Sequence, residues 1–131
     1  MKKLNIICLL ILCSFSLKSQ INGEIISDTS NIKIIRVWGS HYERGFAYGS
    51  LLGSETTIMF NNYLKPLFGS YYSNARDIIT GKQDIKIDSI FEVEAKAIIS
   101  GMDNAGTNLA NMDYVDLLVC NSFLDVSKLM G

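Results

Sequence analysis

The spacing of apolar and polar residues changes several times along the chain, and each change predicts a different element. From residue 32 to residue 38, β-branched apolar residues alternate with Lys33 and Arg36, which is the two-residue period of a β-strand. Gly39 ends this pattern. Residues 20–31, which precede it, are mostly polar. We therefore expect an irregular lead-in followed by one strand.

A long helix is expected directly after the strand. Ser40 is followed three residues later by Glu43, which is the spacing of a capping box. In a capping box, each side chain binds a free backbone N–H at the start of the helix. Proline disfavours helical geometry at the preceding residue, so we expect the helix to stop before Pro66. The sequence therefore predicts a helix over residues 41–64.

Three glycines inside this predicted helix, Gly45, Gly49 and Gly53, are spaced by four residues and share one face. Each glycine costs a helix about 1 kcal/mol relative to alanine. Close approach of another backbone would explain the three glycines, because only glycine leaves room for it. The alternative is a weak helix that breaks near Gly53. We favour close packing against another backbone.

A second helix is expected further along the chain. Residues 68–83 are rich in glycine, serine and tyrosine and predict a loop with one helical turn at most. Asp88 can cap a helix in which apolar residues recur at helical spacing. Gly106 suits the left-handed end of that helix.

A third helix is expected from Met112 to about Ser127, with Asn111 or Asp113 as its cap. Its residues are apolar on nearly all sides, so we expect it to be buried. The predicted fold class is therefore α+β and mainly helical, with one strand and about three helices.

The first 19 residues have the pattern of a secretory signal peptide. Lys2 and Lys3 are followed by an unbroken apolar run over residues 6–12. This run is too short to span a bilayer, which needs about 20 residues. We expect cleavage before Gln20, and hence a mature domain over residues 20–131, with no transmembrane anchor. The predicted location is the periplasm or the extracellular medium.

A lipid anchor on Cys13 is the alternative to simple export. Leu12, which precedes that cysteine, is larger than the residue that lipid attachment normally requires, so we rank this alternative second. Cys120 is the only cysteine of residues 20–131, and these residues therefore hold no internal disulfide framework.

The charge balance argues against polyanionic partners. The whole chain has 12 basic and 13 acidic residues, and the expected signal peptide removes three of the basic ones. The remainder carries a formal net charge of −4, so nucleic acid and anionic membrane surfaces are not expected partners.

Few residues suggest chemistry by themselves. His41, the single histidine, falls in the first turn of a predicted helix, where a surface or packing role is the commonest. No second histidine or cysteine stands near it, so we predict no metal site. Cys120 falls in the apolar third helix, where burial would make it a poor nucleophile. We predict no cofactor, because no phosphate-binding or dinucleotide-binding motif is present.

Two polar residues of the third helix are candidates for a pocket or a contact between subunits. Asn121 and Asp125 are four residues apart on the expected helix, among apolar neighbours. Polar groups buried there must find hydrogen-bond partners. They could fasten the helix to a partner element or line a pocket.

Three stretches resemble the penicillin acyltransferase-like (isopenicillin-N acyltransferase) family. The first, residues 37–52, has a glycine, a small residue, an aromatic residue with glutamate, and then two glycines four apart. The second, residues 94–106, resembles the family's second helix with its Gly-Ala-Gly-like end. The third, residues 116–121, resembles its next helix, which closes on a leucine–asparagine pair. Their order and spacing span residues 32–131.

The resemblance implies an N-terminal-nucleophile hydrolase with a four-layer αββα fold, made as a precursor that cuts its own chain before a cysteine. The new terminal amine then serves as the base that the thiol needs. This chain would be the small-subunit portion, with autocleavage after Gly131 and no catalytic residue of its own. Its partner would be a large catalytic subunit. Cys120 does not match the family's nucleophile position.

The implied activity is hydrolysis or acyl transfer at linear C–N amide bonds, with small acyl amides, including those of lipids or bile acids, as substrates. Hydrolysis is the expected reaction outside the cytoplasm, where acyl-coenzyme A is scarce. The alternative is a secreted binding or interaction module without enzymatic activity. A reading frame that continues into cysteine after Gly131 would favour the enzyme.

Overall fold

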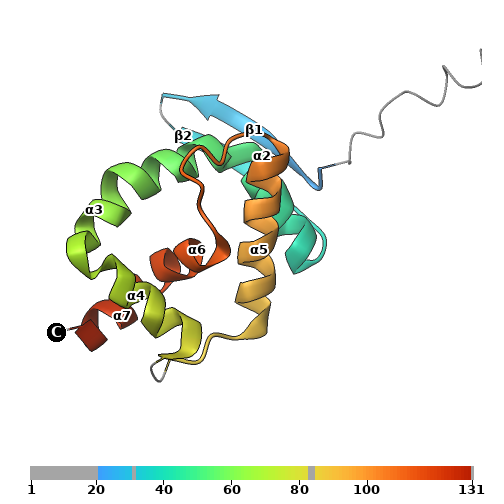
Figure 1. The fold of residues 1–131 in the computed structure, drawn as a ribbon. Helices are drawn as coiled ribbons and strands as arrows, with labels where there is room; N and C mark the ends of the chain where they lie inside the picture. The colour runs from blue at the N-terminus through green and yellow to red at the C-terminus, as the bar shows by residue number, and fades with distance from the viewer. Residues whose placement is uncertain (1–20, 31, 83–84, 131) are drawn as a thin grey trace, which may run out of the picture.

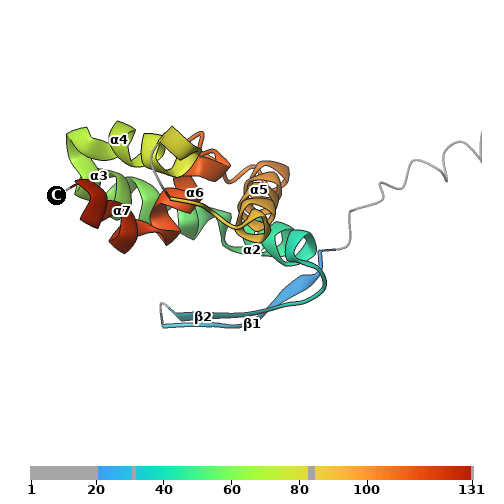
Figure 2. The same cartoon turned by 90° about the horizontal axis from the view of Figure 1, so that it is seen from below.

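The computed structural model describes residues 21–30, 32–82 and 85–130. Two strands, β1 (Gly23–Thr29) and β2 (Ile32–Val37), form an antiparallel hairpin. Helices follow for the rest of the described chain, and they form a layer to one side of the hairpin (Figures 1 and 2). The coarse prediction of a mainly helical α+β chain is therefore confirmed.

The first strand was not predicted, since residues 20–31 were expected to be irregular. β1 forms because its polar residues pair with complementary residues of β2. Glu24 lies opposite Arg36, and Asp28 lies opposite Lys33. Opposite charges directly across a sheet stabilise the pairing. β2 itself agrees with the predicted strand.

Helix α2 (His41–Met59) begins with the predicted capping box. The backbone N–H of Glu43 donates to the Ser40 hydroxyl over 3.3 Å, and the Glu43 carboxylate accepts from the Ser40 backbone N–H over 2.7 Å. The bonds that the carboxylate accepts from the Ser40 backbone N–H and from the Ser40 hydroxyl lower the pKa of Glu43. The expected starting point of the helix is therefore confirmed.

The predicted stop before Pro66 is wrong, because the helical path continues through the proline. A π-helical turn η1 (Phe60–Leu64) follows α2 and leads into α3 (Lys65–Phe68). The backbone N–H of Lys65 donates to the carbonyl of Phe60, five residues back. Proline normally clashes with the carbonyl four residues earlier. The wider π turn changes that register just before the ring.

The described part of the expected loop, residues 68–82, is helical. It contains a 3-10 turn η2 (Gly69–Tyr71), helix α4 (Tyr72–Asp77) and a π turn η3 (Ile78–Lys82). Tertiary contacts explain the difference. The ring of Tyr72 packs edge-on against Phe60 and Phe68, with centroid separations of 5.9 and 6.0 Å.

Helix α5 (Ser89–Asn104) has Asp88 as its cap, as predicted, and Gly106 follows with φ of 67°. The expected third helix is in fact two, α6 (Tyr114–Asn121) and α7 (Phe123–Met130). Asp113 is the cap of α6. The break at Ser122 turns Phe123 onto Phe68, with ring centroids 5.2 Å apart.

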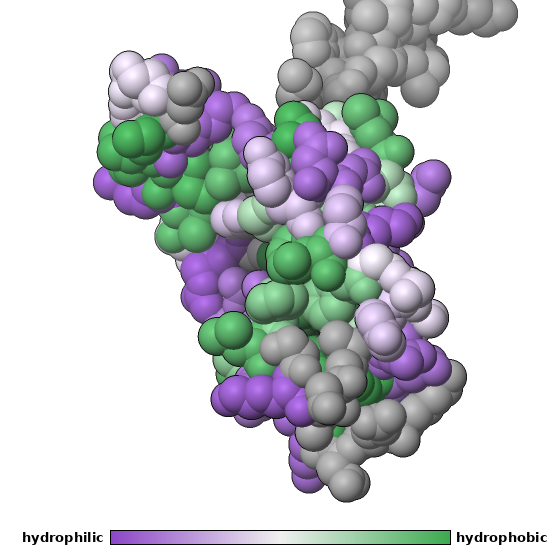
Figure 3. Space-filling view, turned by 90° about the vertical axis from the view of Figure 1, so that its left-hand side faces the viewer, coloured by the Kyte–Doolittle hydropathy of each residue, from purple (hydrophilic) through white to green (hydrophobic). Residues whose placement is uncertain are grey.

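The expected burial holds for α6 but only in part for α7. Val115 to Val119 of α6 are buried, and Val126 of α7 is fully buried. Leu124 of α7, however, is 70% exposed. Figure 3 faces the side of α3 and α7 and shows apolar surface there. The prediction of burial on all sides was therefore wrong for α7, because its apolar residues do not all face the core.

The glycine face of α2 packs along α5. A Cβ atom on Gly45 would lie 2.6 Å from the Glu94 carbonyl oxygen, and one on Gly49 would overlap the Ile98 carbonyl oxygen. Close packing against a backbone is therefore confirmed at these two glycines. Gly53 instead faces the side chain of Thr107.

The alternative of a broken helix also holds in part. Leu52 has non-helical backbone angles, with φ of −123° and ψ of 15°, so α2 bends just before Gly53. The kink and the close packing therefore occur in the same helix.

Candidate functional site

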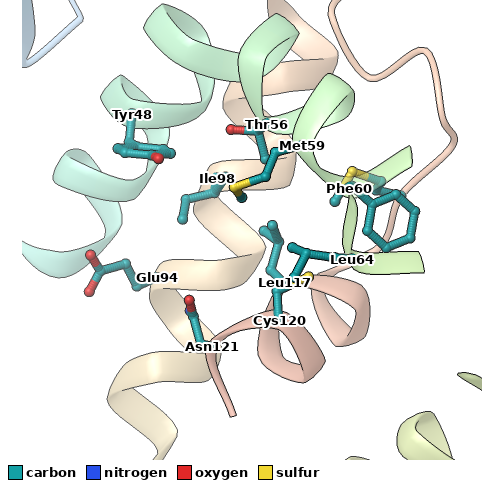
Figure 4. A pocket seen from close by; sticks show the side chains of 11 residues that line it. Tyr48, Thr56, Met59, Phe60, Leu64, Glu94, Ile98, Leu117, Cys120 and Asn121 are labelled. Atoms are coloured by element: carbon teal, nitrogen blue, oxygen red, sulfur yellow. The ribbon is translucent and has the colours of Figure 1, made fainter. Parts of the chain in front are cut away.

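A hollow of about 270 Å³ lies where α2 and η1, α5 and α6 meet. Figure 4 shows the side chains that surround it. Most of its lining is apolar and comes from all of these elements and from the segment before α6: Met59, Phe60, Leu64, Ile98, Met112 and Leu117. An apolar hollow with a few polar groups is the usual form of a small-molecule site.

Three of the polar lining side chains lie on one side of this hollow, whereas Thr56, whose hydroxyl donates to the carbonyl of Leu52, lies near Met59. Tyr48, Glu94 and Asn121 line that side in Figure 4, whereas Phe60 and Leu64 lie on the other. The three polar residues come from α2, α5 and the last position of α6. The hollow therefore has a polar side and an apolar side.

Glu94 is held from α2 by the single histidine. Nδ1 of His41 lies 3.0 Å from the Glu94 carboxylate, and it also lies 3.0 Å from the guanidinium of Arg44. One ring nitrogen can donate or accept, but it cannot do both at once. Arg44 is further anchored by a 2.6 Å bond to the carbonyl of Gly39. The expected surface or packing role of His41 thus includes contact with a residue of the hollow.

Cys120 contributes its thiol to the lining of the hollow, between the polar and the apolar side. Burial, together with the nearby negative charge of Asp116, raises the pKa of this thiol to about 12. The thiolate is the reactive form of cysteine. At neutral pH the group is therefore a small apolar surface rather than a nucleophile.

The other end of α6 is fixed by a polar network that the sequence pattern did not predict. The guanidinium of Arg76, on α4, binds Asp113 over 2.6 Å and also binds the buried carboxylate of Asp116. The Tyr72 hydroxyl donates to the same Asp116. Asp113 and Asp116 additionally form a capping box at the start of α6.

The pKa values in this network move in the directions that pairing requires. The bonds from Arg76 lower the pKa of Asp113, and the bond to Asp113 raises the pKa of Arg76. Burial and then the bond to Asp116 raise the pKa of Tyr72. Asp113 and Arg76 therefore stay charged at neutral pH, and Tyr72 keeps the proton that it donates. The network therefore positions α6, and with it Cys120 and Asn121.

The remaining candidate residues from the sequence analysis lie in different places. Asn121 lines the hollow, whereas Asp125 is exposed on α7 and does not line it. Their expected place on one helix was wrong, because the chain breaks at Ser122 between them. The proposed cleavage position, Gly131, lies outside the described residues.

The described parts of the chain show no group of three or more side chains suited to hold a metal ion. Within the same residues, no helix combines the length and the apolar character needed to cross a membrane.

Comparison with known proteins gives one relative and no family. No protein-family model matches the chain, and no solved structure matches it either. An uncharacterized protein of Archaeoglobus fulgidus is 31% identical over 112 residues. The alignment covers 77% of this chain but only 18% of that protein. The chain thus spans less than a fifth of the length of this relative, whose name states no activity.

Proposed function

We propose that this chain is the N-terminal, small-subunit portion of an exported, autoproteolytic amidohydrolase or acyltransferase of the penicillin acyltransferase-like family. Its substrates are linear C–N amides. The nucleophilic cysteine is expected directly after Gly131, and the large catalytic subunit completes a four-layer αββα domain. The signal peptide over residues 1–19 is part of the same proposal.

The observation that carries the proposal is that the three resembling stretches meet in space. Tyr48 belongs to the first stretch, Ile98 to the second and Asn121 to the third, and all three line one hollow. The resemblance itself depends on the order of residues in each stretch and on no contact between them. Their convergence on one apolar hollow with polar groups is what a shared functional role would require.

The small residues of the first two stretches also match each other physically. A Cβ on Gly49, from the first stretch, would overlap the backbone of Ile98 in the second. A Cβ on Gly101, from the second stretch, would overlap the backbone of Phe46 in the first. The glycines of the two stretches therefore both allow the close packing of α2 on α5.

The hairpin supports the need for a partner subunit. Ile26, Ile32 and Ile34 are each more than half exposed, and the sheet has only two strands within the described residues. It extends along one side of the helices (Figure 2). A two-stranded sheet is marginally stable by itself, so further strands from the catalytic portion would complete it.

The proposed cleavage is an intramolecular reaction. The thiol of the residue after Gly131 attacks the Gly131 carbonyl carbon, and the C–N bond between the two residues breaks as a thioester forms. Water then hydrolyses the thioester and releases the thiol beside a new α-amine. A held geometry replaces a bimolecular encounter, so the rate of cleavage is independent of protein concentration.

The test is the intact mass of the protein purified from its complete reading frame. We expect two fragments, the smaller ending at Gly131, and amidase activity. Substituting the following cysteine by alanine should leave one inactive precursor. Cys120→Ala serves as the control and should still be processed and active. A full-length protein that hydrolyses amides, or loss of both activities in Cys120→Ala, would show that the proposed chemistry is wrong.

A further inference from the structure

We propose that the hollow between α2, α5 and α6 binds a small linear amphiphile with a nitrogen head group that donates hydrogen bonds, such as an alkylammonium ion. The apolar chain lies against η1 and Leu117, and the nitrogen lies at Glu94 and Asn121. This assignment goes beyond the proposed amidase, since it depends on the lining of the hollow and not on the missing nucleophile.

The size of the hollow excludes larger occupants. Its volume of about 270 Å³ lies just below the range of about 300–1,000 Å³ that is usual for small-molecule sites. A helix with its side chains is about 10–12 Å across, and it would not enter a hollow of this volume. A single unbranched chain with a compact head group is the shape that fits.

The arrangement of the lining gives the orientation of the ligand. Phe60 and Leu117 both line the hollow, and both are buried. Burial of an apolar chain there removes its methylene groups from water, which favours binding. The opposite side has Tyr48, Glu94 and Asn121, where a polar head can keep its hydrogen bonds.

Glu94 selects the sign of the head group. A carboxylate has two oxygens that accept hydrogen bonds and none that donates. Within residues 21–30, 32–82 and 85–130, the hydrogen bond recorded at this carboxylate is that of Oε2 with His41. A donor on the ligand can therefore bind the second oxygen.

The tautomer of His41 decides how many hydrogen bonds Glu94 can accept from a ligand. Nδ1 of His41 lies 3.0 Å from both Arg44 and Glu94. When Nδ1 accepts from the guanidinium, it cannot also donate to the carboxylate. Glu94 then lacks that donor and takes one from the ligand. An ammonium group meets this requirement, and a carboxylate head group would be repelled.

Calorimetric titration with three probes of equal chain length tests the assignment: octylammonium, octanol and octanoate. The protein is purified from its complete reading frame. Because Glu94 is partly exposed, we expect octylammonium to bind about fivefold more tightly than octanol, the effect of a solvent-exposed ion pair. Octanoate should bind more weakly than octanol. Equal affinities for octylammonium and octanoate, or no binding of octylammonium, would overturn the proposal.

A matched pair of variants on α5 locates the head group. Glu94→Gln should reduce the affinity for octylammonium to that for octanol. Glu92→Gln removes the same charge from the same helix, but Glu92 pairs with Lys96 and does not line this hollow. It should leave the preference unchanged. Equal effects of the two variants would mean that the preference reflects the general charge of the surface.

Protection of Cys120 from alkylation tests, without any substitution, where the alkyl chain of the ligand binds. Because the raised pKa of this thiol makes its alkylation slow, the reaction is followed by peptide mass during prolonged incubation with excess reagent. Saturating octylammonium should slow it further, because the thiol lines the hollow. An unchanged rate would place the ligand elsewhere and contradict the proposal. These binding measurements need no turnover. A protein that binds octylammonium but is never processed keeps this assignment and refutes only the proposed amidase.

Discussion

The two walls of the hollow are held by different kinds of interaction. On one side, α2 and α5 approach through glycines, with a Cβ on Gly49 excluded by the backbone of Ile98. On the other side, α6 is fixed to α4 by the charges of Arg76 and Asp116 and by the Tyr72 hydroxyl. The contact at the glycines is steric and carries no charge. The second contact depends on charged groups, of which Asp116 is buried and Arg76 is partly exposed.

This difference shows how a chain with a small core can still position a site. The glycine contact between α2 and α5 should respond to side-chain volume and not to pH. The wall of α6 should respond to the loss of a charge, since an unpaired buried carboxylate is costly. Variants that affect only one wall can therefore separate the two contributions.

The largest effect is expected for Gly49→Leu, which places a side chain where the backbone of Ile98 lies. Overpacking usually costs about 1–3 kcal/mol, and the backbone of α5 cannot move aside as a side chain could. We expect a loss of about 3 kcal/mol or more in unfolding free energy, measured by urea denaturation. Ser54→Leu on the exposed side of the same helix is the control. An equal loss in both variants would contradict the packing argument.

The next effect is expected for Arg76→Met. The substitution keeps most of the side-chain volume and leaves Asp113 and the buried Asp116 without their cation. Removing one partner of a buried pair costs about 3–5 kcal/mol. We expect the lower end of this range, because Arg76 and Asp113 are partly exposed.

The control for Arg76→Met is Arg36→Met. Arg36 pairs with Glu24 on the hairpin surface and is 67% exposed, so its removal should cost less than about 1 kcal/mol. Urea denaturation of both variants makes the comparison. If the two losses were the same, the network of α4 and α6 would be an ordinary surface contact.

The sequence predicted the features that depend on near neighbours. The capping box of Ser40 and Glu43 and the cap at Asp88 were found because each cap and its partners lie within three residues. The close packing at Gly45 and Gly49 was also predicted, because glycines at helical spacing weaken a helix unless another backbone packs against them. The identity of the partner helix was not predicted, since nothing local to α2 specifies it.

Features that depend on distant residues were missed. Arg76 lies 40 residues from Asp116, and no local pattern links them. β1 is mostly polar and shows no clear strand pattern. The signal that could have revealed it is charge complementarity, since Glu24 and Asp28 face the basic residues Arg36 and Lys33 of β2. The hollow combines Tyr48 and Asn121, which are likewise remote in sequence. Candidate chemistry was therefore harder to predict than the helices that carry it.

The smallest effect is expected from pH, and it should act on the charged contact of α4 and α6 but not on the glycine contact of α2 and α5. Arg76 holds the pKa of Asp113 below its ordinary value in the folded state. A depressed folded-state pKa gives stability that is fully present above the unfolded-state pKa, about 3.9 for aspartate. That stability is lost as the pH falls toward the lower, folded-state pKa. Acid should therefore weaken the contact between α4 and α6.

The substitution Asp113→Asn isolates this contribution, because asparagine also caps helices well but does not titrate. At pH 7 the variant should be less stable than the wild type, since the charge opposite Arg76 is gone. As the pH falls below about 4, the difference in unfolding free energy should shrink, because the wild-type carboxyl becomes neutral as well. Gly49→Leu changes no charge, so its deficit should stay constant over the same range. Urea denaturation from pH 7 to pH 3 measures both differences. If the loss of unfolding free energy in Asp113→Asn does not change with pH, Asp113 acts through its hydrogen bonds and not through its charge. The two walls would then differ in geometry alone.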